Sequence, residues 1–378
     1  MKFFHYFFSI TLFLILLFFI ISPNSIITAT KDSATLFVNA IFPSLFPFLL
    51  LSTLVQNSAI IAFFNKFLHK IMKPIFNLPG VSSIALFLGM VGGYPIGAKT
   101  TADLVENKFI SKNDAKKLIA FANNSGPLFI LGAVGTIMYK NKYIGILLLL
   151  SHYIAALVVG FLFRFYKNTP KIYSETSTIQ IDFIKISDLS KVLTDAIKKA
   201  IMTISIIGGF IIIFGIITTI LTEIKIFFVI SKILFPTIEP ELCTAIFTGI
   251  LEVTNGISKI SSLNILSLSN KLILTSILLG FGGISVHMQT LSIINKVGLS
   301  SSTYFIGKSM QGIFSGLITF LLIRYTNFSY LIYESAFATY ARYSYGFNKL
   351  ISTIILCFLF IVVFKILQIF IDVKKGDY

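Results

Sequence analysis

One carboxylate, Glu252, stands inside an otherwise apolar stretch and is closely followed by Thr254, Asn255 and Gly256. A charged side chain at the centre of a lipid bilayer costs about 2.5 kcal/mol or more, so such residues face protein, water or a ligand. We interpret Glu252, Thr254 and Asn255 as candidates for binding a polar substrate, and Glu252 also for coupling to H⁺ or Na⁺. The alternative is a shallow position in which Glu252 is solvated or salt-bridged.

A glycine-rich turn lies earlier in the chain, with the sequence GGYPIG at residues 92–97. Glycine allows the backbone to approach a ligand closely, and a helix that begins at such a turn offers unpaired N–H groups to an anion. The turn therefore supplies further candidate substrate-binding residues, namely Gly92, Gly93, Tyr94, Pro95 and Gly97. Close packing between membrane helices is the alternative use of these glycines.

Three polar residues, Asn123, Asn124 and Ser125, interrupt another apolar segment directly before a Gly-Pro pair. Unpaired polar groups are costly in an apolar surrounding, so these side chains must face protein, water or substrate. Amides both donate and accept hydrogen bonds, which suits a nucleobase or another neutral polar solute. Substrate binding and structural hydrogen bonding between helices both remain open for this cluster.

A fourth cluster follows Gly282 and contains Gly283, Ser285, His287 and Gln289. We take Gly283, Ser285 and Gln289 as candidate substrate-binding residues. His287 is a candidate coupling residue, because an imidazole can exchange a proton near neutral pH. The alternative role of His287 is a structural hydrogen bond.

No arrangement typical of an enzyme accompanies these clusters. The sequence contains no phosphate-binding Walker loop, no G-x-S-x-G and no zinc-binding H-E-x-x-H. The four histidines and two cysteines have no metal-ligand spacing. We therefore expect a protein that is not an enzyme and that needs no metal and no cofactor.

The clusters lie in a sequence that is 56% hydrophobic and only 12% charged, with a mean hydropathy of +0.90. Soluble domains are about 25% charged, and open strands cannot span a bilayer, so we expect an all-α polytopic membrane protein. The net charge of +16 is typical of basic cytoplasmic loops and indicates the lipid bilayer, and no nucleic acid, as a partner. Six apolar runs read as spanning helices: Phe7–Ile21, Leu36–Val55, Tyr143–Phe163, Ile201–Leu221, Tyr304–Ile323 and Leu350–Ile371.

The interruptions recur after about 160 residues, an internal repeat that predicts two similar halves. Gly89 then falls on Gly249, and Ser125 falls on Ser285. Each half has a span, a broken segment, a basic linker, a second broken segment and a span. Five regions follow: an N-terminal helix and outer loop at 1–34, a first repeat at 35–165, a cytoplasmic linker at 166–195, a second repeat at 196–325, and a loop with a C-terminal helix at 326–378.

Charge placement indicates that the two repeats are inverted, with both termini in the cytoplasm. If residues 81–105 form a re-entrant hairpin, the basic cluster at 108–117 stays in the cytoplasm, as the positive-inside rule requires. A full crossing would place that cluster outside. We therefore predict about eight transmembrane helices plus two re-entrant helical hairpins in an inverted repeat. Secondary transporters share this architecture and bind solutes near the membrane midplane, at broken helices.

Three sequence motifs carry a family resemblance: FPSLFPFLLLSTLV at 42–55, GGYPIGAKTTADL at 92–104 and AFANNSGPLFILGAVGTIMY at 120–139. Together they resemble the YlbJ-type family of sporulation integral membrane proteins. The resemblance covers about residues 35–325 and implies a nucleoside-recognition (gate) domain, related to parts of concentrative nucleoside transporters. It also implies a role in forming the spore cortex of endospore-forming bacteria. True transporters of that kind carry acidic residues in both hairpins. Here the tip of the first hairpin has none, and Glu252 in the second hairpin is the acidic residue that remains.

These observations lead to the expectation of a sporulation membrane protein that carries a small polar solute, nucleoside-like or related to the cortex. We expect it in the bacterial cell or forespore membrane. H⁺ and Na⁺ are the candidate coupling ions, and self-association into a homo-oligomer is left open. A rival from another class is a non-transporting membrane scaffold that recruits spore-assembly partners through the linker at 164–199. The burial of polar groups at paired breaks favours the carrier, because a scaffold would not need it.

Overall fold

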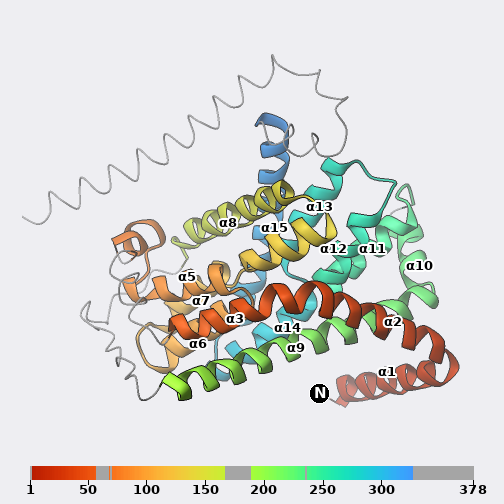
Figure 1. The fold of residues 1–378 in the computed structure, drawn as a ribbon, viewed down its shortest axis with the longest axis horizontal. Helices are drawn as coiled ribbons and strands as arrows, with labels where there is room; N and C mark the ends of the chain where they lie inside the picture. The colour runs from red at the N-terminus through yellow and green to blue at the C-terminus, as the bar shows by residue number, and fades with distance from the viewer. Residues whose placement is uncertain (1, 57–67, 69, 167–188, 235, 327–378) are drawn as a thin grey trace, which may run out of the picture.

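The computed structural model describes residues 2–56, 68, 70–166, 189–234 and 236–326 (Figure 1). The predicted C-terminal span at 350–371, the region 327–378 and most of the predicted linker lie outside these ranges. All regular structure in the described part of the chain is helical. Its elements are α1 (Lys2–Ile21), α2 (Pro23–Leu36), η1 (Phe37–Ile41), α3 (Phe42–Gln56), η2 (Gly80–Ser82), α5 (Ser83–Gly92), α6 (Ile96–Glu106), α7 (Lys112–Ala122), η3 (Phe129–Met138), α8 (Lys142–Phe163), α9 (Leu189–Glu223), α10 (Ile226–Leu234), α11 (Pro240–Leu251), α12 (Val253–Ser262), α13 (Leu268–Phe281), α14 (Gly283–Ile294), η5 (Asn295–Val297) and α15 (Ser301–Tyr325).

Long apolar helices make this an integral membrane protein. Within the described residues, four helical stretches are long and apolar enough to cross a bilayer: 142–163, 190–223, 268–297 and 301–325. The number rises to six if two sharply bent helix pairs, at 15–41 and 70–92, each count as one span. The predicted total of eight spans and their inverted orientation stay predictions. Helix α9 begins at Leu189, so the predicted linker at 166–195 becomes helical before its end.

Both predicted hairpins have the expected local form. Helices α5 and α6 pack against each other across a short turn in which Gly93 has φ of +78°. A positive φ costs little for glycine and is unfavourable for residues with a Cβ atom. Helices α11 and α12 pack together in the same way, and Glu252 alone separates them in an extended conformation. None of these four helices, which have 10 to 12 residues each, is long enough to cross a bilayer by itself.

The two remaining breaks also interrupt helices where the sequence predicted. Helix α7 ends at Ala122, and the π-helical segment η3 begins only at Phe129. Helices α13 and α14 are separated by Gly282, and both Gly282 and Gly283 have positive φ. Each break frees backbone groups that a continuous helix would pair internally.

Helix α15 lies at the centre of the packing. It contacts α13, α8 and α7, and so connects the broken helices of the two halves. On another side, the long helix α9 runs beside α2 and α3, as Figure 1 shows. A hydrophobic core packs hairpin α5–α6 against α7, and another packs η3 and α8 against α12 and α13. The four breaks are thereby held close to one another.

Candidate functional site

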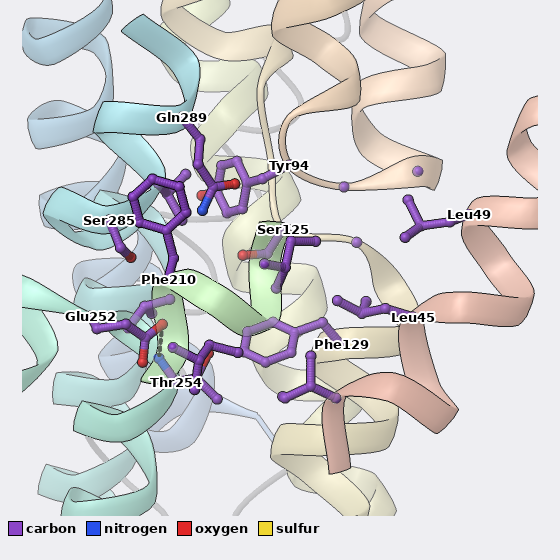
Figure 2. A pocket seen from close by; sticks show the side chains of 18 residues that line it. Leu45, Leu49, Tyr94, Ser125, Phe129, Phe210, Glu252, Thr254, Ser285 and Gln289 are labelled. Carbon is purple, nitrogen blue, oxygen red and sulfur yellow. Dashed lines mark hydrogen bonds between the residues drawn. The ribbon is translucent and has the colours of Figure 1, made fainter. Parts of the chain in front are cut away.

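Residues at or close to all four breaks line one cavity of about 60 Å³. Its walls include the turn of the first hairpin, the α7 break, the turn of the second hairpin and the first turns of α14. Figure 2 shows Glu252, Ser285 and Gln289 on one side of the cavity, with Leu45 and Leu49 on the opposite side. The cavity therefore has a polar wall and an apolar wall, as small-molecule sites commonly do.

Glu252 lies on the polar wall and is 2% exposed. Its Oε1 accepts the backbone N–H of Thr254 at 3.0 Å, and its Oε2 accepts that of Asn255 at 2.7 Å. The carboxylate thus caps the N-terminus of α12, where anionic groups are stabilised by the helix dipole. Each oxygen keeps further acceptor capacity that a solute in the cavity can use. This burial argues against the shallow, solvent-exposed position that was the alternative for Glu252.

Tyr94 connects the first hairpin to the second half of the chain. Its hydroxyl donates to the Leu279 carbonyl oxygen at 3.2 Å. A Cβ atom added to Gly282 would lie 3.1 Å from this hydroxyl. The turn of one hairpin is therefore seated directly on the break between α13 and α14.

The amides of the α7 break are used inside the protein. Asn123 Oδ1 accepts the Ala98 backbone N–H at 3.3 Å, and Asn123 Nδ2 donates to Thr290 Oγ1 at 2.9 Å. Asn124 Nδ2 donates to the Phe121 carbonyl oxygen at 2.7 Å. Both asparagines are fully buried and line no part of the cavity. Of the two roles left open for them, this geometry favours structural hydrogen bonding.

Two residues that the sequence argument missed complete this network. Lys308 Nζ donates to the Asn123 carbonyl oxygen at 3.0 Å and to Gln311 Oε1 at 2.7 Å. Gln311 Nε2 in turn donates to Asn124 Oδ1 at 2.8 Å. A lysine and a glutamine three positions apart share one helical face. Their presence in the apolar run Tyr304–Ile323 was the signal that could have identified them.

The two buried histidines lie at opposite ends of the same network. His152 Nε2 accepts the Ser125 backbone N–H at 3.1 Å. His287 Nδ1 lies 3.0 Å from the Tyr304 hydroxyl, which donates to Thr290 Oγ1 at 3.2 Å. His287 is packed edge-on against aromatic rings and does not line the cavity. Its predicted role in coupling stays a prediction.

The predicted binding residues divide into two groups. Eight of them line the cavity: Gly92, Gly93, Tyr94, Ser125, Glu252, Thr254, Ser285 and Gln289. The others, Pro95, Gly97, Asn123, Asn124, Asn255 and Gly283, lie outside its lining. A Cβ atom on Gly97 would come within 2.2 Å of the Ala122 carbonyl oxygen, so this glycine permits close packing of α6 on α7. Asn255 Nδ2 donates to the Ile211 carbonyl oxygen at 3.1 Å.

Comparison with known proteins agrees with this membrane architecture. Residues 38–169 match the Gate family model, described as nucleoside recognition. The sporulation integral membrane protein YlbJ of Bacillus subtilis (strain 168) is 33% identical over 319 residues, which cover 79% of this chain and 78% of that protein. A solved structure of a variant of the concentrative nucleoside transporter CNTnw, in its intermediate 1 state, aligns with a TM-score of 0.47 and 11% identity, covering 75% of this chain and 76% of that one. From the extent of the match to YlbJ, the chain belongs to the YlbJ family of sporulation integral membrane proteins.

Proposed function

We propose that this protein carries a small polar solute of the nucleoside class across the cell or forespore membrane, and that spore cortex formation depends on it. It acts as a carrier without covalent chemistry. The observation that carries the proposal is a single cavity lined by residues at or close to four helix breaks. In membrane carriers, interrupted helices are tolerated where they line a cavity, and solutes bind there.

The polar wall offers groups that the protein itself does not use. The Ser125 hydroxyl is buried beside the Tyr94 hydroxyl and makes no hydrogen bond of ordinary geometry with the described residues. Within the same part of the chain, the side chains of Ser285 and Gln289 make no hydrogen bond, and both line the cavity. Such groups are costly to bury unless a ligand or water satisfies them. Together with the Glu252 carboxylate, they can both donate to and accept from a sugar or base.

The aromatic rings in the lining suit a flat, ring-bearing solute. Phe129 and Phe210 line the cavity together with Tyr94 (Figure 2). Aromatic side chains stack on or pack edge-to-face against other rings. A cavity of about 60 Å³ holds only a few water-sized groups, so entry of a nucleoside requires the hairpin turns and α14 to separate. That movement is the opening step of the proposed carrier.

Binding is tested with purified full-length protein and a defined solute panel. Uridine and adenosine are added in increasing concentration while thermal unfolding is followed, because a ligand of the native state raises the unfolding midpoint. Ribose and free uracil serve as fragments, and uptake of labelled uridine into proteoliposomes measures transport. We expect a saturable rise with a nucleoside, and its loss in Glu252→Gln and in Gln289→Leu. Glu241→Gln removes an exposed carboxylate from the same hairpin and is the matched control.

The same variants separate the carrier from a scaffold during sporulation. We expect Glu252→Gln to reduce cortex formation in a complementation assay, with membrane abundance unchanged, whereas Glu241→Gln complements fully. Normal cortex with both site variants at normal abundance, together with no response to any nucleoside, would overturn the carrier. That combination is the result that a non-transporting scaffold predicts.

A further inference from the structure

A lysine is buried among the described helices, and no acidic partner lies beside it in that part of the chain. Lys308 is fully buried, and within the described residues its ammonium contacts only neutral groups. These are the Asn123 carbonyl oxygen at 3.0 Å, Gln311 Oε1 at 2.7 Å and the face of the Tyr94 ring, whose centroid lies 5.1 Å away. Burying an ammonium is expensive unless hydrogen bonds compensate it. A structural lysine of this kind needs an explanation.

The position of the ammonium is the C-terminal end of a half-helix. Asn123 is the C-cap of α7, where the chain leaves the helical conformation. The last carbonyl groups of a helix lack internal partners and carry the negative end of the helix dipole. Unwound carbonyl groups and half-helix C-termini are the groups that hold Na⁺ in carriers built from broken helices. Here those oxygens already hold a cation that belongs to the chain.

We propose that the Lys308 ammonium is a built-in cation that occupies the α7 break in place of a free alkali cation. From helix α15, where Gln311 also holds it, the ammonium reaches two other elements: the break itself through the Asn123 carbonyl oxygen, and the turn of the first hairpin through Tyr94. A diffusible Na⁺ at this position would make the contact between the hairpin and the break depend on external Na⁺. The consequence for ion coupling rests on the carrier function proposed above, whereas the occupation of the break does not.

Thermal unfolding of the purified full-length protein tests the proposal directly. Samples are compared in choline chloride, NaCl, KCl and LiCl at equal ionic strength. We expect the wild-type unfolding midpoint to be the same in Na⁺ and choline, because the oxygens are already occupied. A saturable stabilisation of the wild type that is specific for Na⁺ would overturn the proposal. No solute is present, so this result is independent of nucleoside binding.

Two substitutions of Lys308 distinguish an occupied site from a merely buried side chain. Lys308→Ala leaves the oxygens in place and opens space beside them, so its midpoint should fall in choline and recover in part with Na⁺ or methylammonium. Lys308→Met fills the space with an uncharged side chain. Its unfolding midpoint should fall in choline as well, but Na⁺ and methylammonium should not raise it again. The same response to Na⁺ in Lys308→Ala and in the wild type would contradict the proposal.

Lys271→Ala is the matched control for these variants. Lys271 is half-buried, and its Nζ also donates to a backbone carbonyl oxygen, that of Ser261 at 3.1 Å. It is away from any helix break, so we expect no recovery by cations. If Lys308→Ala does not accumulate in the membrane, the Na⁺ titration of the wild type decides alone.

Discussion

The α7 break and the second hairpin turn bury polar groups in two different ways. At the α7 break, the asparagine side chains and the Asn123 carbonyl are occupied by partners from α6, α14 and α15. At the second hairpin turn, Glu252 bonds only to the N-terminus of its own helix α12 and faces the cavity. The asparagines of the α7 break are thus paired within the protein, whereas Ser125 beside them and Glu252 at the second hairpin turn line the cavity.

This difference teaches that a polar interruption in a membrane helix does not by itself mark a binding site. A buried polar network whose members are paired fixes one arrangement of helices, because each member is costly to leave unpaired. Groups turned to a cavity contribute less to stability and more to recognition. Substitutions of the paired polar residues at the α7 break should therefore act on folding, and substitutions of the unpaired polar groups at the cavity should act on solute binding.

The glycines one repeat apart, Gly89 and Gly249, give the largest expected effect. A Cβ atom on Gly89 would lie 1.8 Å from the Ala122 carbonyl oxygen, which is backbone and cannot move aside. On Gly249 it would lie 2.3 Å from Leu278 Cδ1, the end of a side chain that can change its conformation. Overpacking costs about 1–3 kcal/mol. We expect Gly89→Ala to exceed this range and Gly249→Ala to stay within it.

Membrane abundance and the thermal unfolding midpoint measure this contrast. Gly209→Ala is the control, because a Cβ atom there meets nothing within 4 Å. We expect it to accumulate like the wild type, with at most about 1 kcal/mol gained from helix propensity. Equal losses for Gly89→Ala and Gly249→Ala would show that the two hairpins are packed alike, against the difference described here.

The second contrast uses two glutamines. Gln311→Leu removes one of the oxygen atoms that accept a hydrogen bond from the Lys308 ammonium. It also leaves Asn124 Oδ1 without the donor Gln311 Nε2. Loss of a buried hydrogen bond to a charged group costs about 1.5–3 kcal/mol, so the unfolding midpoint should fall clearly. Gln289→Leu removes no hydrogen bond within the described part of the chain. We expect its midpoint to be unchanged while its response to uridine is lost. A fall in stability for Gln289→Leu and none for Gln311→Leu would reverse the assignment.

Part of this site could be predicted from sequence because membrane insertion penalises polar groups. Glu252, Ser285 and Gln289 stand out in apolar surroundings, and the spacing of the breaks indicates that they belong together. Local rules also predict the glycine turns, because a positive φ favours glycine. The division between paired and unpaired groups could not be predicted, because it depends on contacts between residues far apart in the chain. Lys308 and its partner Asn123, for example, are separated by 185 positions.

The smallest expected effect concerns Tyr94, which contacts Lys308 of the α7 network and also lines the cavity. Tyr94→Phe removes the hydrogen bond to the Leu279 carbonyl oxygen but keeps the ring beneath Lys308. A neutral hydrogen bond contributes about 0.5–1.5 kcal/mol, so a small fall in the unfolding midpoint is expected. Tyr94→Leu also removes the cation–π contact and should lose about 1 kcal/mol more. Tyr143→Phe, whose hydroxyl makes no hydrogen bond to the described residues, should match the wild type. If Tyr94→Phe destabilised the protein as much as Gln311→Leu, the hairpin turn rather than the α7 network would be the main connection between the two halves.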